Sequence, residues 1–251
     1  MKKRKRAGKL GHHEHRRTPT HQRGGRAKDM DLAEAESAAF GAGRKTPRTS
    51  SRVANVGKPR DSVTEWEERV QAQFDALKRF ASSRGCSLKD KQLPPRSWGK
   101  SGREHEVFHA PGAKRFWKST FPGESGFGQF GYYTPAGYLR RLRLSNLIFG
   151  DDVEFEGIWT REGGLSIVTS QKYIQAHPVR FIPTAEEITG YLNSLGFTHN
   201  DSLMLWERDD GVQLADTHDR NFIRAPDEAI IAIDVQPRLL PGHEFDAVRH
   251  G

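Results

Sequence analysis

The sequence contains a single cysteine, Cys86, and no long hydrophobic run. One cysteine excludes an internal disulfide and a zinc site built from cysteines. The apolar runs fall far short of the roughly 20 residues that span a bilayer, which excludes a transmembrane helix. The basic N-terminus is not followed by the apolar stretch of a secretory signal. These absences predict a cytoplasmic protein that makes no membrane contact.

Hydrophobic residues make up only 35% of the 251 residues, and the net charge of +8 is unevenly spread. Residues 1–60 hold 17 Lys and Arg against 5 Asp and Glu, whereas the rest of the chain is mildly acidic. We therefore expect residues 1–60 to form a disordered basic tail. Such a tail could make weak contacts with the phosphates of a nucleic acid by releasing counterions. A nucleic-acid-binding protein with a basic tail is thus one alternative function.

Regular structure is expected to begin where this tail ends. Ser62 and Glu65 form a capping box, and apolar residues then recur at steps of three and four. This pattern predicts one amphipathic helix that packs on the rest of the protein. We interpret residues 61–97 as this helix and a linker, and residues 98–251 as the main domain.

The main domain shows a mixture of helical and alternating patterns, which predicts an α+β fold. The expected elements are a hairpin at 106–120, a helix at 134–149, strands at 153–159 and 165–170, a helix at 184–195, and strands at 203–207, 212–215 and 229–233. A loop with two glycines at 98–102 precedes the hairpin. A lone pair of glycines is weak evidence for phosphate binding, so this segment is interpreted as an ordinary loop.

Four polar side chains carry the chemistry. Phosphoryl transfer requires a carboxylate that orients the attacking hydroxyl, oxygen ligands for magnesium, and a cation on the nucleotide phosphates. Asp216 suits the first role, and Asn221, five residues later, can supply an amide oxygen to a metal. Asp234 ends a buried apolar strand and can supply a carboxylate, while Lys118 lies on a predicted strand early in the domain. Asp and Asn are also common turn formers, so the prediction depends on the combination.

The pattern Asp-x-His-x-x-Asn at 216–221, followed by an apolar strand that ends at Asp234, resembles the protein-kinase-like fold. Three further segments resemble the serine/threonine/tyrosine kinase domain of phage and mobile-element polyvalent proteins, and these are Glu104–Val107, Tyr138–Asn146 and Phe149–Asp151. The resemblance covers about residues 98–240. It implies a bilobal fold with a small β-rich N-lobe at about 98–169 and a truncated C-lobe at about 170–240.

The resemblance also implies an activity and assigns residues to it. It implies an ATP- and Mg²⁺-dependent kinase that transfers the γ-phosphoryl group to a hydroxyl of an unknown acceptor, which is a small molecule, a protein or the chain itself. The assigned residues are Lys118 for the nucleotide phosphates, Asp216 as the catalytic carboxylate, Asn221 and Asp234 for magnesium, and the backbone around Val168, Ser170 and Lys172 for the adenine.

Several departures from the kinase pattern support a second alternative, a pseudokinase that binds a nucleotide or a partner as a scaffold. The helix at 134–149 contains no acidic residue to pair with Lys118. Either Glu124, Glu154 or Glu156 takes this role, or no residue does. A glycine-rich G-x-G-x-x-G loop is missing, and only 17 residues follow Asp234, where an activation segment and a substrate platform are expected.

Overall fold

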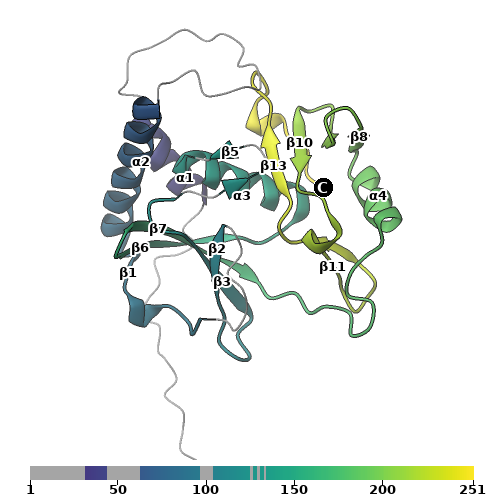
Figure 1. Cartoon of the computed structure of the whole chain (residues 1–251), viewed down its shortest axis with the longest axis horizontal. Coiled ribbons are helices and arrows are strands. Elements are labelled where there is room, and N and C mark those ends of the chain that lie inside the picture. The colour runs from purple at the N-terminus through teal and green to yellow at the C-terminus, as the bar shows by residue number, and fades with distance from the viewer. Residues whose placement is uncertain (1–31, 44–62, 97–103, 125–126, 129–130, 133) are drawn as a thin grey trace, which may run out of the picture.

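The computed structural model describes residues 32–43, 63–96, 104–124, 127–128, 131–132 and 134–251. These residues form a mixed α+β fold with several sheets (Figure 1). The helices are α1 (Leu32–Gly43), α2 (Val63–Arg84), α3 (Pro135–Phe149) and α4 (Ala185–Ser194), with short 3-10 helices at Asp90–Gln92, Asp219–Asn221 and Phe245–Ala247. None of the described helices is long and apolar enough to cross a membrane.

The first main sheet has five strands in the order β1-β6-β7-β3-β2. Its strands are β1 (Ser87–Leu88), β2 (His105–Phe108), β3 (Arg115–Thr120), β6 (Glu154–Arg161) and β7 (Gly164–Lys172). β1 runs parallel to β6, and the other neighbours are antiparallel. The expected hairpin β2–β3 is confirmed, and the two strands expected at 153–159 and 165–170 pair with each other as the hairpin β6–β7. In this register Lys118 lies opposite Val107 on one side and Thr169 on the other.

Strand β6 is irregular at Gly157, where the register shifts relative to β7. Gly157 has a φ of 145°, and a Cβ atom added to it would lie 2.0 Å from the backbone oxygen of Cys86. The backbone N–H of Ile158 donates to that same oxygen at 3.2 Å. A glycine is therefore required for the chain before β1 to approach β6 this closely.

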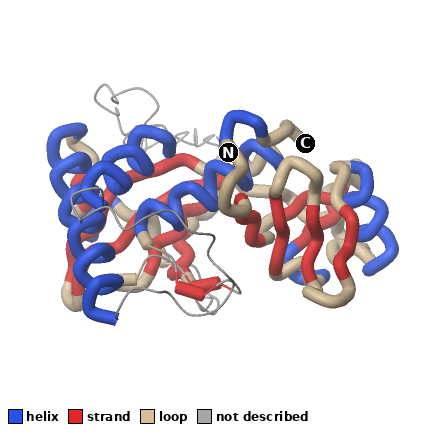
Figure 2. Tube along the Cα trace, turned by 90° about the horizontal axis from the view of Figure 1, so that it is seen from above, coloured by secondary structure: helices blue, strands red, loops and turns tan. Residues whose placement is uncertain are grey.

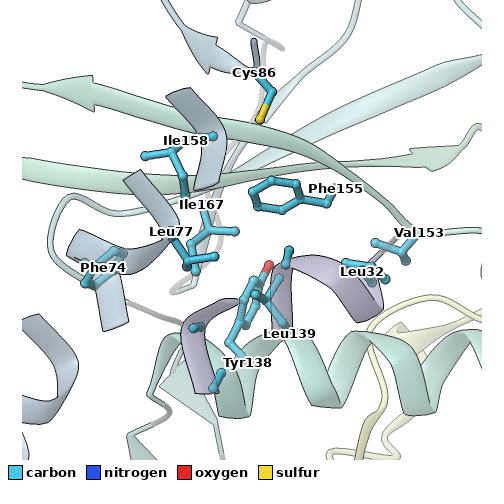
Figure 3. Packing of buried hydrophobic residues seen from close by; sticks show 14 of the residues in the cluster. Leu32, Phe74, Leu77, Cys86, Tyr138, Leu139, Val153, Phe155, Ile158 and Ile167 are labelled. Carbon is cyan, nitrogen blue, oxygen red and sulfur yellow. The ribbon is translucent and has the colours of Figure 1, made fainter. Parts of the chain in front are cut away.

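The helices α1, α2 and α3 cover one face of the first sheet and build a hydrophobic core with it (Figure 3). Phe74 and Leu77 of α2 and Leu139 of α3 are buried against Ile158 and Ile167 of the sheet. The apolar residues of α2 recur at helical spacing, so the sequence predicted this docking face. The predicted capping residue Ser62 and the predicted loop at 98–102 lie outside the described residues.

Helix α1 is a correction to the sequence prediction. Residues 1–60 were expected to form a disordered tail, and this is wrong for residues 32–43, which are helical. Leu32, Ala35 and Ala39 are almost completely buried in the core with α2 and α3. Glu36 accepts a hydrogen bond from Arg143 of α3. The basic composition of residues 1–60 indicated disorder for the whole segment. The burial of this short alanine-rich helix depends on partners distant in the sequence, which composition does not indicate.

The second main sheet is antiparallel, with the order β13-β10-β9-β8. Its strands are β8 (Thr198–Asn200), β9 (Leu205–Glu207), β10 (Val212–Ala215) and β13 (Gln236–Leu239). Two small hairpins accompany the sheets, β4 (Phe127–Gly128) with β5 (Gly131–Tyr132), and β11 (Phe222–Arg224) with β12 (Ile230–Ala232). β8 was not expected, and the strands expected at 203–207 and 229–233 are shorter.

Helix α3 connects the two parts of the molecule. Its first half contributes Tyr138 and Leu139 to the core of the first sheet, and its second half contributes Leu144 and Ile148 to a separate core beneath the second sheet. The two sheets lie on either side of this helix (Figures 1 and 2). The sequence predicted both ends of α3 correctly: Thr134 accepts a hydrogen bond from the backbone of the first turn, and Gly150 is left-handed.

Candidate active site

Lys118 and Asp234 lie far apart in the sequence and meet in space. Lys118 points from β3 on the same side of the strand as Phe116, whose ring its Nζ approaches to 5.4 Å. Asp234 follows β12, where the backbone N–H of Ile233 donates to the backbone oxygen of Asn221 at 2.9 Å. Lys118 Nζ lies 3.5 Å from Asp234 Oδ1. The structure therefore brings together a cation from the first part and a carboxylate from the second.

A cleft surrounds this pair, between the first sheet, helix α3 and the segment after β12. Its empty volume is about 430 Å³, part of which is open to solvent. The lining residues are His105, Lys118, Tyr138, Arg141, Leu142, Ser145, Asp151, Val153, Thr169, Gln171, Ile233, Asp234 and Val235. Most of these side chains are polar, which suits a charged ligand better than an apolar one.

The carboxylate of Asp234 is available to a ligand from the cleft, because 53% of its side-chain surface is exposed. Burial of the group works to raise the pKa of Asp234, but the positive charges of Lys118 and Arg141 outweigh this and hold the pKa below its usual range. Asp234 is therefore ionised at neutral pH. An ionised and reachable carboxylate is the kind of ligand that a divalent cation prefers.

Asp216 and Asn221 form a second, adjacent group at the end of β10. Asn221 Nδ2 donates to the backbone oxygen of Asp216 at 2.7 Å, so this hydrogen bond uses the amide nitrogen of Asn221 and not its oxygen. Asp216 has a φ of 57°, unusual for a residue other than glycine. Its carboxylate lies 3.3 Å from His218 Nε2 and 3.3 Å from Gln236 Nε2. Neither Asp216 nor Asn221 lines the cleft itself, although Asn221 is bonded to Ile233, which does.

A comparison with protein families matches residues 70–240 to the family described as a serine/threonine/tyrosine kinase found in polyvalent proteins. The chain belongs to this family. The match begins inside α2, so the family domain includes part of that helix and extends beyond the 98–240 expected from the sequence. No curated protein and no solved structure matches the chain.

Membership of the polyvalent-protein kinase family implies nucleotide binding and, for kinases in general, the use of ATP. The described residues fit a magnesium ion in the chemistry of their donor atoms. Asp234 offers an ionised carboxylate oxygen and Asn221 an amide oxygen, which are hard ligands of the type that Mg²⁺ selects.

None of the three residues whose backbone is expected to contact the adenine lines the cleft. Val168 and Ser170 belong to the central strand β7, where each is paired with both β3 and β6. Their backbone groups are committed to these ladders, and Thr169 and Gln171 line the cleft instead. Lys172 is the last residue of β7 and pairs only with Arg115 of β3. The contact with the adenine therefore stays a prediction.

Two of the three acidic residues considered as partners of Lys118 are bound to other groups. Glu154 forms an ion pair with Arg115, with Oε1 and Nη1 3.1 Å apart. Glu156 accepts a hydrogen bond from Ser170 at 2.6 Å. Glu124 is exposed at the end of the described segment after β3. None of these three forms the expected pair in the described part of the chain.

Helix α3 contributes a cation to the cleft, which the sequence analysis missed. Arg141 is 5% exposed, and its two terminal nitrogens bind the two carboxylate oxygens of Glu104 at 2.8 and 2.9 Å. The bidentate geometry fixes the guanidinium firmly against the cleft. Glu104 and Arg141 are distant in the sequence, so no local spacing could have indicated the pair.

His105 and Tyr138 form the buried floor of the cleft and were also missed. His105 Nε2 lies 2.8 Å from Tyr138 Oη. Burial lowers the pKa of His105 to about 3, so the imidazole is neutral, and burial raises the pKa of Tyr138, so the phenol keeps its proton. Both side chains therefore act as neutral hydrogen-bonding groups. A histidine or tyrosine at a core position of a strand or helix carries no sequence signal of this role.

Proposed function

We propose that this protein is an ATP- and Mg²⁺-dependent phosphotransferase that transfers the γ-phosphoryl group to a hydroxyl. The observation that carries the proposal is the meeting of Lys118 and Asp234, 3.5 Å apart in a polar cleft. In a kinase the cation on the phosphates and the metal-binding carboxylate act on the same nucleotide, so the two groups must lie in one cleft. Family membership supports the same reaction class.

The roles of the residues follow from their positions. Lys118 binds the phosphates, because its ammonium faces the cleft from the first sheet. Asp234 and Asn221 would hold Mg²⁺, which when bound neutralises charge on the β- and γ-phosphates. Asp216 orients the acceptor hydroxyl, and the hydrogen bond from Asn221 to its backbone oxygen holds the loop that carries it.

In this account the two parts of the molecule are the lobes of a kinase-like fold. The N-lobe, at about 98–169, contains α3 and most of the first sheet, and the truncated C-lobe lies at about 170–240. The segment after Lys172 joins them and is the proposed contact for the adenine. Helix α2 belongs with the N-lobe, because its apolar face is buried against that sheet.

The first test is phosphoryl transfer from radiolabelled ATP to generic protein and small-molecule acceptors and to the protein itself. Replacement of Asp234 or Asp216 by asparagine keeps the shape of the side chain and removes its charge. We expect each variant to lose about 100-fold or more in rate and to remain folded by circular dichroism. Asp201→Asn is the control, since this aspartate is 97% exposed. Unchanged turnover in the Asp234 variant would reject the mechanism.

A pseudokinase scaffold is the second candidate function. The observation that favours it is that α3 presents Arg141, held by Glu104, where an active kinase is expected to present an acidic residue. A thermal-shift measurement separates the two candidates. A rise in melting temperature with ATP and Mg²⁺, without transfer of phosphate to any acceptor, would favour the scaffold. The nucleic-acid alternative concerns the basic segments outside the described residues and stays a prediction.

A further inference from the structure

Asp151 is a buried acid that the proposed mechanism does not use. It follows the left-handed Gly150 at the end of α3 and precedes Asp152, which also has a positive φ, of 54°. These two conformations turn the chain so that Asp151 is only 9% exposed and lines the cleft. Ser145 donates a hydrogen bond to Asp151 Oδ2. Asp151 Oδ1 is buried and has no hydrogen-bond partner among the described residues.

An unpartnered buried carboxylate oxygen is costly, so it calls for an explanation. Burial raises the pKa of Asp151 to about 6, while the hydrogen bond from Ser145 and the charge of Lys118 act in the opposite direction. The side chain is thus mostly ionised at neutral pH. A residue that served packing alone would be more stable here as an apolar or amide side chain.

The charged groups that line the cleft with Asp151 come from three segments, β3, α3 and the residues after β12. Lys118 extends from β3 and Arg141 from α3, while Asp234 approaches from the segment after β12. His105 of β2 is neutral and contributes no charge. Arg141 is already bound through both terminal nitrogens by Glu104. Among the described residues that line the cleft, Lys118 is therefore the cation that can form an ion pair with Asp151.

The other acidic residues near β3 have partners other than Lys118, either arginines or, in the proposed function, a metal ion. Glu106, next to His105 on β2, binds Arg96 and Arg161. Asp234 now faces Lys118, but in the proposed function it binds a metal ion and cannot at the same time neutralise the lysine. Of the described residues that line the cleft, Asp151 is then the remaining carboxylate.

We propose that Asp151 is the acidic partner that positions Lys118, in place of the acidic residue that α3 lacks. This inference rests on the proposed function, because Lys118 needs a second acidic partner only when Asp234 holds a metal ion. In that state Asp151 Oδ1, which has no hydrogen-bond partner among the described residues, accepts a hydrogen bond from the ammonium group of Lys118. Asp151 acts through Lys118 and touches neither the phosphate nor the acceptor, so it is a positioning residue.

The pairing is testable without any nucleotide, by the rate at which acetic anhydride labels Lys118, read by mass spectrometry of the peptide that carries it. Removal of a nearby negative charge favours the neutral, reactive amine. We expect Asp151→Asn to speed the labelling of Lys118 by about fivefold. The control is Asp152→Asn, which removes the same charge from the next residue, at a side chain that faces Arg115. Equal labelling rates in the two variants would overturn the proposal.

Kinetics then separate this inference from the proposed function. In an active enzyme, Asp151→Asn should raise the KM for ATP about tenfold or more, and Asp151→Glu should restore part of the loss. A wild-type protein that transfers no phosphate, but whose Lys118 labelling responds to Asp151→Asn, would reject the proposed function and keep the pairing. Loss of activity in Asp151→Asn with labelling equal to wild type would show a merely structural role and overturn the inference.

Discussion

Replacement of Asp151 by asparagine should stabilise the folded protein at neutral pH. The asparagine has nearly the same shape and can still accept the hydrogen bond from Ser145. In the native state the pKa of Asp151 is raised from 3.8 to about 6, because burial penalises the charged form. Each pKa unit corresponds to about 1.4 kcal/mol, so keeping this carboxylate ionised in the fold costs about 3 kcal/mol.

The sign of the pH dependence follows from the raised pKa. Between about pH 4 and pH 6 the folded state binds a proton at Asp151 that the unfolded state has released, so stability at this site falls as the pH rises. Asparagine cannot ionise and removes this loss. The free energy of unfolding of Asp151→Asn should thus equal that of wild type near pH 4 and exceed it by up to about 3 kcal/mol at pH 8.

Urea unfolding followed by tryptophan fluorescence at pH 4, 5, 6, 7 and 8 measures this difference. Asp152→Asn is the matched control, because Asp152 is half exposed and pairs with Arg115 at the surface. Its difference from wild type should stay small at every pH. An Asp151→Asn variant that is less stable than wild type at pH 8, or that differs by a constant amount over the whole range, would refute the reasoning.

Three further substitutions test the packing of the fold. Gly157→Ala should destabilise the protein by about 3 kcal/mol or more, because its Cβ would collide with the backbone oxygen of Cys86. Gly41→Ala in α1, where a Cβ meets no atom within 4 Å, should leave the melting temperature unchanged or slightly raised. Arg141→Met should cost about 3 kcal/mol, since Glu104 would stay buried without its partner. An Arg141→Met variant as stable as wild type in urea would show that the pair is dispensable.

The elements with a local signal were predictable from the sequence. Helix α3 begins after the cap Thr134 and ends at Gly150, and helix α4 begins at the capping box of Thr184 with Glu187, where the structure places them. In each case the decisive contacts join residues within one turn of the helix. The same holds for the hairpin turn between β6 and β7.

Features that depend on distant residues were not predictable. Helix α1 exists because Leu32 and Ala35 are buried by α2 and α3, and nothing within the segment indicates those partners. Alternation along β7 shows that Val168 and Ser170 share a face. It does not show that the opposite face borders the cleft, because that depends on the order of strands and on where α3 crosses the sheet.

The candidate site shows the same division. The spacing of Asp216 and Asn221 and the apolar strand before Asp234 are local, so the sequence indicated them. Asp151 stands beside a glycine that ends a helix, and its burial becomes visible only when Ser145 and the cleft are in place.

The central claim is that Lys118 and Asp234 hold a nucleotide with its metal. Calorimetric titration with a nonhydrolysable ATP analogue, with and without Mg²⁺, tests this claim most directly. We expect binding that requires Mg²⁺ in the wild-type protein and is lost in both Lys118→Met and Asp234→Asn. Binding of equal affinity without Mg²⁺, or undiminished binding in Asp234→Asn, would contradict it.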